Sequence, residues 1–89
     1  MTATPIDNYP QAVLLEVQKI FREVLRDTRL VLDLDMQTGS HPAWDSFANV
    51  EILMRCEEFW HLRFSSAEID RMLDIRQLVS VIASKISMS

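Results

Sequence analysis

The stretch from Trp44 to Ile82, WDSFANVEILMRCEEFWHLRFSSAEIDRMLDIRQLVSVI, decides the fold because it contains the starts of three helices. The first of these follows Asp45, whose carboxylate can accept hydrogen bonds from the exposed N–H groups of a first helical turn. We therefore expect a helix that begins at Asp45 or Ser46 and runs to about Trp60.

Two further helix starts follow in the same stretch. Ser65 and the glutamate three residues later form a capping-box pattern, which predicts a short helix through about Met72. Asp74, with Gln77 three residues later, begins a last helix in our interpretation. The apolar residues of that helix keep helical spacing, and they are Ile75, Leu78, Val79, Ile82 and Ile86.

The segment before Trp44 supplies one long helix and a long loop. Apolar residues at three- and four-residue intervals predict a helix from about Pro10 to Asp27. From Thr28 to Trp44 the leucines alternate, which would fit a short strand, but we favour an extended loop that packs Leu30, Leu32 and Leu34 onto a helical core. The sequence thus predicts an all-α fold, a small bundle of three main helices plus one short helix with a long first loop. We divide the chain into a polar lead-in (1–9), one domain (10–86) and a tail (87–89).

Composition excludes several kinds of site. The chain has 89 residues with a single glycine and a single cysteine, Cys56. Nucleotide-binding turns, phosphate-binding loops and nucleophile elbows each need several glycines, and thiolate metal sites need several cysteines. His41 and His61 are not at metal-ligand spacing, so we expect no metal site and no catalytic residues.

Charge and hydropathy suggest where the protein works. Thirteen acidic residues against nine basic ones give a net charge of −4, which argues against nucleic acid as a partner. No apolar run reaches the roughly 18 residues that a membrane span needs, and the first residues lack the features of a signal peptide. We expect a cytoplasmic monomer.

The predicted helix 46–60 has two apolar faces, whereas an outer helix of a small bundle needs one. We assign the bulkier face to the core, and it contains Asn49, Ile52, Leu53, Cys56, Phe59 and Trp60. Phe47, Val50 and Met54 then remain exposed, bordered by Glu51, Glu57 and Glu58. Such an apolar strip with an acidic border is typical of a recognition surface. A helix packed between neighbours on both faces would explain the same pattern.

Ser46 stands at the start of this helix, directly after the capping Asp45. A phosphate esterified to its hydroxyl would be stabilised by the positive end of the helix dipole. For an arbitrary Asp-Ser pair an ordinary capping serine is the better explanation, and composition and spacing alone do not overturn it.

These residues resemble the acyl carrier proteins. The family has Asp-Ser-Leu at the start of its second helix, where this chain has Asp45, Ser46 and Phe47. Glutamate five residues after the serine and an apolar residue eight after it are matched by Glu51 and Met54. The Glu57-Glu58-Phe59-Trp60 run also fits the family pattern, and the resemblance extends over about Val13 to Ile86.

The resemblance implies that Ser46, presented by Asp45, receives 4′-phosphopantetheine from coenzyme A through a separate phosphopantetheinyl transferase. The protein would then be a carrier and not an enzyme, taking an acyl-type group as a thioester between partner enzymes in fatty-acid, polyketide or other specialised biosynthesis. Stand-alone carriers are the most similar type. Two alternatives stay open: an aminoacyl or peptidyl carrier, and a helical interaction module with this fold but no prosthetic group.

The resemblance also implies a docking surface for acyl-loading and acyl-processing enzymes, whose own docking surfaces are basic. Its residues would be Phe47, Val50, Glu51, Met54, Glu57 and Glu58. Two departures bear on partner choice. Phe47 replaces the usual leucine, and Arg55 puts a positive charge inside the acidic helix.

Overall fold

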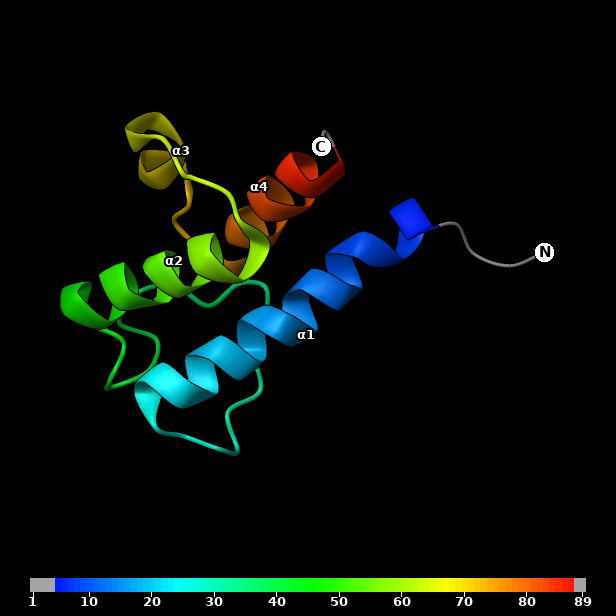
Figure 1. Ribbon diagram of the computed structural model, residues 1–89. Coiled ribbons are helices and arrows are strands. Elements are labelled where there is room, and N and C mark those ends of the chain that lie inside the picture. Colours follow the sequence, from blue (N-terminus) through cyan, green and yellow to red (C-terminus); the bar gives the residue numbers. More distant parts are fainter. Residues whose placement is uncertain (1–4, 88–89) are drawn as a thin grey trace.

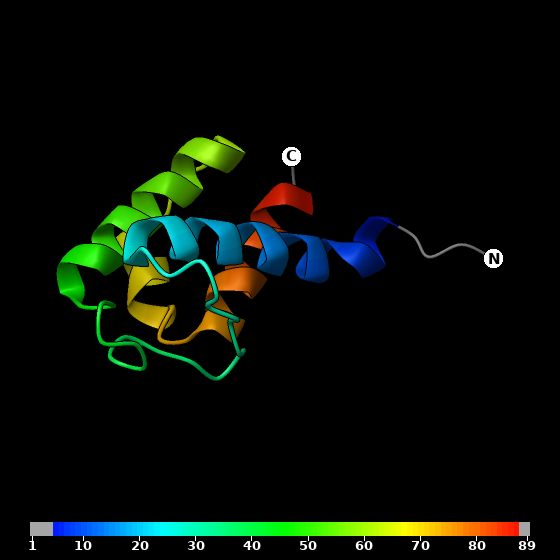
Figure 2. The ribbon, with the colours of Figure 1, turned by 90° about the horizontal axis from the view of Figure 1, so that it is seen from below.

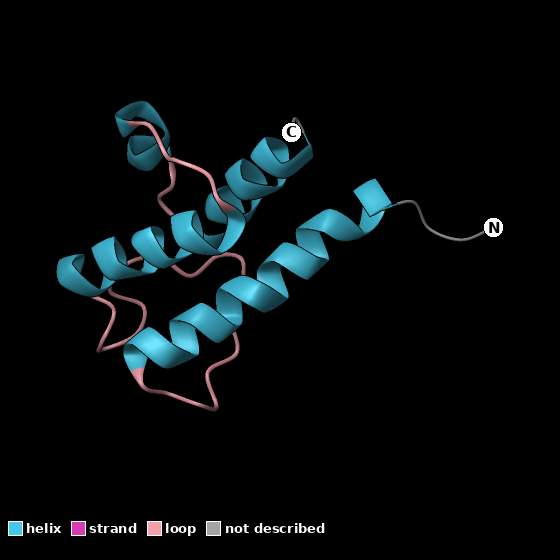
Figure 3. Ribbon diagram, viewed as in Figure 1, coloured by secondary structure: helices cyan, strands magenta, loops and turns pink. Residues whose placement is uncertain are grey.

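The described part of the chain contains four helices and the loops that connect them. The computed structural model describes residues 5–87, and residues 1–4 and 88–89 lie outside that range. The helices are α1 (Pro5–Leu25), α2 (Ser46–Trp60), α3 (Ser66–Arg71) and α4 (Ile75–Ser87) (Figure 1). Within residues 5–87, Figure 3 shows only helices and loops. The predicted all-α fold is confirmed.

The bounds of α1 differ from those expected. The helix begins at Pro5, so the polar lead-in expected over 1–9 is wrong for residues 5–9, which are helical. Proline fits a first helical position because its missing N–H would have no partner there. Pro10 lies further inside α1 and costs one backbone hydrogen bond without ending the helix. At the other end Arg26 adopts a left-handed conformation (φ 55°) and stops the helix before Asp27.

The other helices begin where the capping patterns predicted. In α3 the Ser65 hydroxyl accepts from the Glu68 backbone N–H (3.1 Å), and the Glu68 carboxylate accepts from the Ser65 N–H (2.8 Å). At α4 the Asp74 carboxylate accepts from the Gln77 N–H (2.9 Å). Each of these contacts joins residues three apart, so local sequence was enough to predict them.

The core lies where α1 packs against both α2 and α4. The side chains that are almost completely buried come from these three helices, and they are Val17, Phe21, Ile52, Cys56, Ile75 and Ile82. The short α3 contributes no buried residue and connects α2 to α4.

The long loop between α1 and α2 runs along one side of the helices (Figure 2). Leu30 and Leu32 are buried and Leu34 packs partly against the core, as predicted. The Leu32 N–H donates to the Gln18 side chain (2.8 Å), and the backbone N–H of Arg76 donates to the Leu34 carbonyl (2.9 Å). The loop is therefore fixed to α1 and α4 by both apolar and polar contacts.

Candidate functional site

Trp44 fixes the position at which α2 begins. Its side chain is 4% exposed and packs edge-on against Phe21 of α1, with ring centroids 4.8 Å apart. Its indole N–H donates to the side-chain oxygen of Asn49 in the first turns of α2 (3.0 Å). Because one side chain contacts both helices, the residues that follow it have a defined place relative to the core.

Asp45 caps α2 as predicted, and its carboxylate accepts from the Ala48 N–H (2.9 Å). Ser46 is the first residue of the helix and is exposed. Within residues 5–87 its hydroxyl makes no hydrogen bond. The first turn of α2 contains no acidic residue, so apart from the cap no negative side chain offsets the positive end of the helix dipole. A phosphate group attached at Ser46 would fit this environment.

Beyond Ser46 the outward face of α2 is apolar. Phe47 is 88% exposed, Val50 57% and Met54 55%. Large side chains of this kind cost free energy in water, and together they form a contiguous strip on one helix. We call these three residues the α2 strip. Their expected exposure is confirmed, and the interpretation of α2 as packed on both faces is wrong.

One residue assigned to the inward face lies elsewhere. Phe59 is 52% exposed and packs edge-on against Trp60, with ring centroids 4.9 Å apart. Ile52 and Cys56 are buried and lie four residues apart on one face of α2, and the next residue on that face is Trp60, not Phe59. The half-buried Trp60 therefore continues the face that contacts the core, and Phe59 lies toward solvent.

The acidic residues beside the α2 strip differ in how they are bonded. Arg55 donates to the Glu51 carboxylate (3.0 Å) and to that of Glu23 in α1 (3.1 Å). The Glu57 carboxylate accepts from the Phe64 backbone N–H (2.8 Å). Glu58 is exposed and has no such partner within the described chain.

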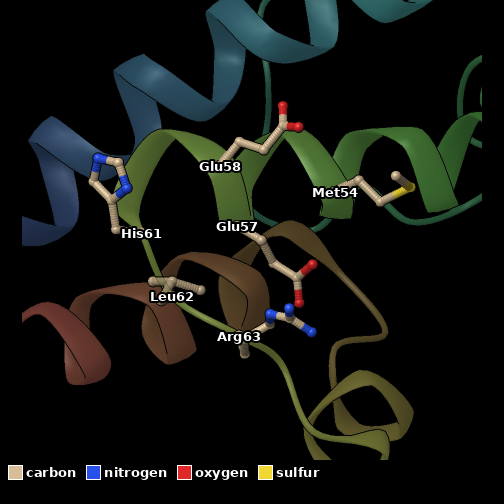
Figure 4. A pocket seen from close by; sticks show the side chains of 6 residues that line it. All are labelled: Met54, Glu57, Glu58, His61, Leu62 and Arg63. Carbon is tan, nitrogen blue, oxygen red and sulfur yellow. The ribbon is translucent and has the colours of Figure 1, made fainter.

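The Glu57 and Glu58 side chains also face different surroundings. Both line an open hollow of about 590 Å³ at the end of α2. Glu57 and Arg63 extend toward one another across it, whereas Glu58 points the other way (Figure 4). Sequence spacing placed the glutamates on one border, and only the fold shows that they are not equivalent.

Other candidates for chemistry have structural roles. Cys56 is buried, and burial raises the pKa of its thiol to about 12, so it is not a nucleophile at neutral pH. His41 bonds to the Asp27 carboxylate (2.9 Å) and accepts from the Ala43 N–H (3.0 Å), which ties the loop to the end of α1. In the described chain no three potential metal-ligating side chains come together.

Two exposed apolar residues near α3 were missed from the sequence. Ile69 is 41% exposed and Leu73 is 65% exposed. They lie in and just after a helix of six residues, which is too short for a reliable apolar period. The only signal in the sequence was the apolar character of these two residues.

The fold defined by these helices is shared with a solved structure. The chain is similar to the solution NMR structure of a holo acyl carrier protein from Geobacter metallireducens, with a TM-score of 0.77 and 21% sequence identity. The likeness covers 91% of this chain and 88% of that one. No family model and no curated protein matches the sequence. The chain has the acyl carrier protein fold, so the resemblance inferred from its sequence is confirmed at the level of fold.

Among residues 5–87, no helix combines the length and apolar character needed to cross a bilayer.

Proposed function

We propose that this protein is an acyl carrier protein whose Ser46 hydroxyl receives 4′-phosphopantetheine from coenzyme A. The observation that carries the proposal is the exposed Ser46 at the capped start of α2, in a domain with the acyl carrier protein fold. The attached group would supply a terminal thiol that holds an acyl-type group as a thioester. Its fit to this site rests on the exposed hydroxyl and on the absence of an acidic side chain in the first turn.

The chain's own residues would present the hydroxyl and contact partner enzymes. Asp45 and Trp44 hold the start of α2 in place through the hydrogen bonds described above. The transferase would catalyse attack of the Ser46 oxygen on the phosphate next to the pantetheine of coenzyme A. The P–O bond of the pyrophosphate would break, adenosine 3′,5′-bisphosphate would leave, and the hydroxyl proton would pass to a base of the transferase or to water. The protein is a carrier in this proposal and not an enzyme.

The α2 strip and Glu58 are the surface that we propose for docking. Partners would be the phosphopantetheinyl transferase and the enzymes that load and process the acyl group. Apolar contacts would supply most of the affinity, while charges at the border would steer encounter and orientation. We propose a cytoplasmic monomer that serves fatty-acid, polyketide or other specialised biosynthesis.

The test is the intact mass of the protein after incubation with coenzyme A, magnesium and a broad-specificity phosphopantetheinyl transferase. Wild type should gain one phosphopantetheine, and Ser46→Ala should gain none. Ser66→Ala is the matched control, because Ser66 is also an exposed first helical residue after a capping side chain. It should be loaded like wild type.

Two results would contradict the proposal. If wild type gains no mass, the α2 strip belongs to an interaction module that keeps the fold without the group. If Ser46→Ala gains the same mass as wild type, another residue is the attachment site. Mass spectrometry of the group carried in the producing cell would separate an acyl from an aminoacyl or peptidyl carrier.

A further inference from the structure

Arg55 bonds to two carboxylates, one of which, Glu51, borders the α2 strip. Its guanidinium donates to Glu51, one turn earlier on α2, and to Glu23 on α1. The three side chains are 41% (Arg55), 54% (Glu51) and 67% (Glu23) exposed. Exposed ion pairs of this kind contribute little to stability. The larger consequence concerns charge, because one arginine offsets the glutamate that borders the strip.

Glu57 is engaged as well. Its carboxylate accepts from the Phe64 N–H (2.8 Å), and the Arg63 side chain extends toward it (Figure 4). Glu58 is the carboxylate of this border that has no partner in the described chain. Beside the three exposed apolar residues, Glu58 is therefore the one carboxylate of the border, within residues 5–87, that is available to pair with a cation of a partner.

We propose that Arg55 sets partner selectivity by keeping the Glu51 carboxylate in an ion pair within this protein. The α2 surface then fits a partner groove that is apolar opposite Phe47, Val50 and Met54. The cation of such a groove lies opposite Glu58. This inference rests on the proposed carrier function and specifies its partner class. A partner with a cation directed at Glu51 meets the guanidinium of Arg55 at the same carboxylate and is repelled by it. Partners with several basic side chains are thus disfavoured, and those with an apolar groove are accepted.

The test is the rate of Ser46 loading by a broad-specificity phosphopantetheinyl transferase at low and high salt. Arg55→Gln frees Glu51 and should raise kcat/KM about threefold at low ionic strength, since charges at an interface rim act mainly on association. The gain should disappear at about 0.5 M salt, where such charges are screened. Arg29→Gln is the matched control, because it removes the same charge from an exposed residue of the long loop.

A double-mutant cycle assigns the gain to Glu51. Glu51→Gln should change loading little in wild type and should cancel the gain in Arg55→Gln, whereas Glu58→Gln should slow loading in both. An unchanged melting temperature for Arg55→Gln would exclude a folding effect. If Arg55→Gln loads at the wild-type rate, or if its gain survives Glu51→Gln, the selectivity role is wrong while the carrier function stands. If wild type is not loaded at all, both proposals fail.

Discussion

α2 and α4 are helices of similar length that use their apolar residues in opposite ways. α4 buries Ile75, Leu78, Val79 and Ile82 along one stripe. α2 buries only Ile52 and Cys56 and exposes Phe47, Val50 and Met54. Exposing large apolar side chains does not stabilise a monomer, so the excess on α2 supports the docking surface proposed above. α4 thus serves the core, whereas α2 carries the proposed docking surface.

The contrast between buried α4 residues and exposed α2 residues predicts the largest difference in unfolding free energy between two variants. Ile82→Ala should lower the free energy of unfolding by about 3 kcal/mol, because it removes a fully buried side chain and leaves a cavity. Val50→Ala, on the outward face of α2, should change it by less than about 0.5 kcal/mol. Urea unfolding followed by circular dichroism measures both. Equal losses for the two variants would contradict the assignment of faces.

Loading of Ser46 should respond in the opposite way, with a large effect from an exposed residue of α2 that contributes little to stability. Phe47→Ala should leave the unfolding free energy within about 0.5 kcal/mol of wild type. Under the carrier proposal it should reduce kcat/KM for Ser46 loading about tenfold, equivalent to about 1.4 kcal/mol, because an exposed aromatic anchor is lost from the docking surface. Exposed Val31, which lies on the long loop, provides the control as Val31→Ala. Unchanged loading of Phe47→Ala would remove Phe47 from the docking surface.

The start of α2 depends on its cap. Asp45→Ala should lower the unfolding free energy by about 1 kcal/mol, since the Ala48 N–H loses its acceptor. Asp45→Asn keeps an oxygen at that position and should cost less. The comparison of the two variants by urea unfolding separates the hydrogen bond from the charge. Equal losses in the two variants would show that charge, and not the hydrogen bond, makes the cap.

The smallest expected effect is a pH dependence of the unfolding free energy, caused by the contact between Glu68 of α3 and Lys85 of α4. Hydrogen bonds from the Ser65 N–H and from Lys85 lower the pKa of Glu68 below its ordinary value of 4.5. A lowered folded-state pKa means that the stabilisation is present above pH 4.5 and is lost as the pH falls through the folded-state pKa. Glu68→Gln should therefore be less stable than wild type at pH 6, and the difference should shrink as the pH falls below 4.5.

The matched control for the substitution is Glu58→Gln, because Glu58 is a partnerless carboxylate within the described chain. At pH 6 its urea midpoint should stay close to that of wild type, since the substitution removes no hydrogen bond there. A Glu68→Gln difference that stays constant from pH 6 to pH 3 would contradict the linkage.

Most of the helix starts could be predicted from the sequence, and the buried partners of α2 could not. Asp45 and Ser65 act on N–H groups three residues away, so their caps are visible in the local sequence. Phe59 was assigned to the core because it lies near Cys56 on the helix, yet Trp60 takes that place. The contact between Arg55 and Glu23 joins residues 32 positions apart, and no local pattern indicates it.

The helix caps and the position of Ser46 at the start of a helix were predictable from the sequence, because they depend on hydrogen bonds between residues three apart. The apolar alternation of the long loop also indicated that Leu30 and Leu32 pack on the core. The folded structure was needed to show that Trp60, and not Phe59, completes the covered face of α2, and which glutamate beside the α2 strip stays uncommitted. Those outcomes depend on which distant side chains, from α1 and from the segment after α2, come within hydrogen-bonding or packing distance once the chain has folded.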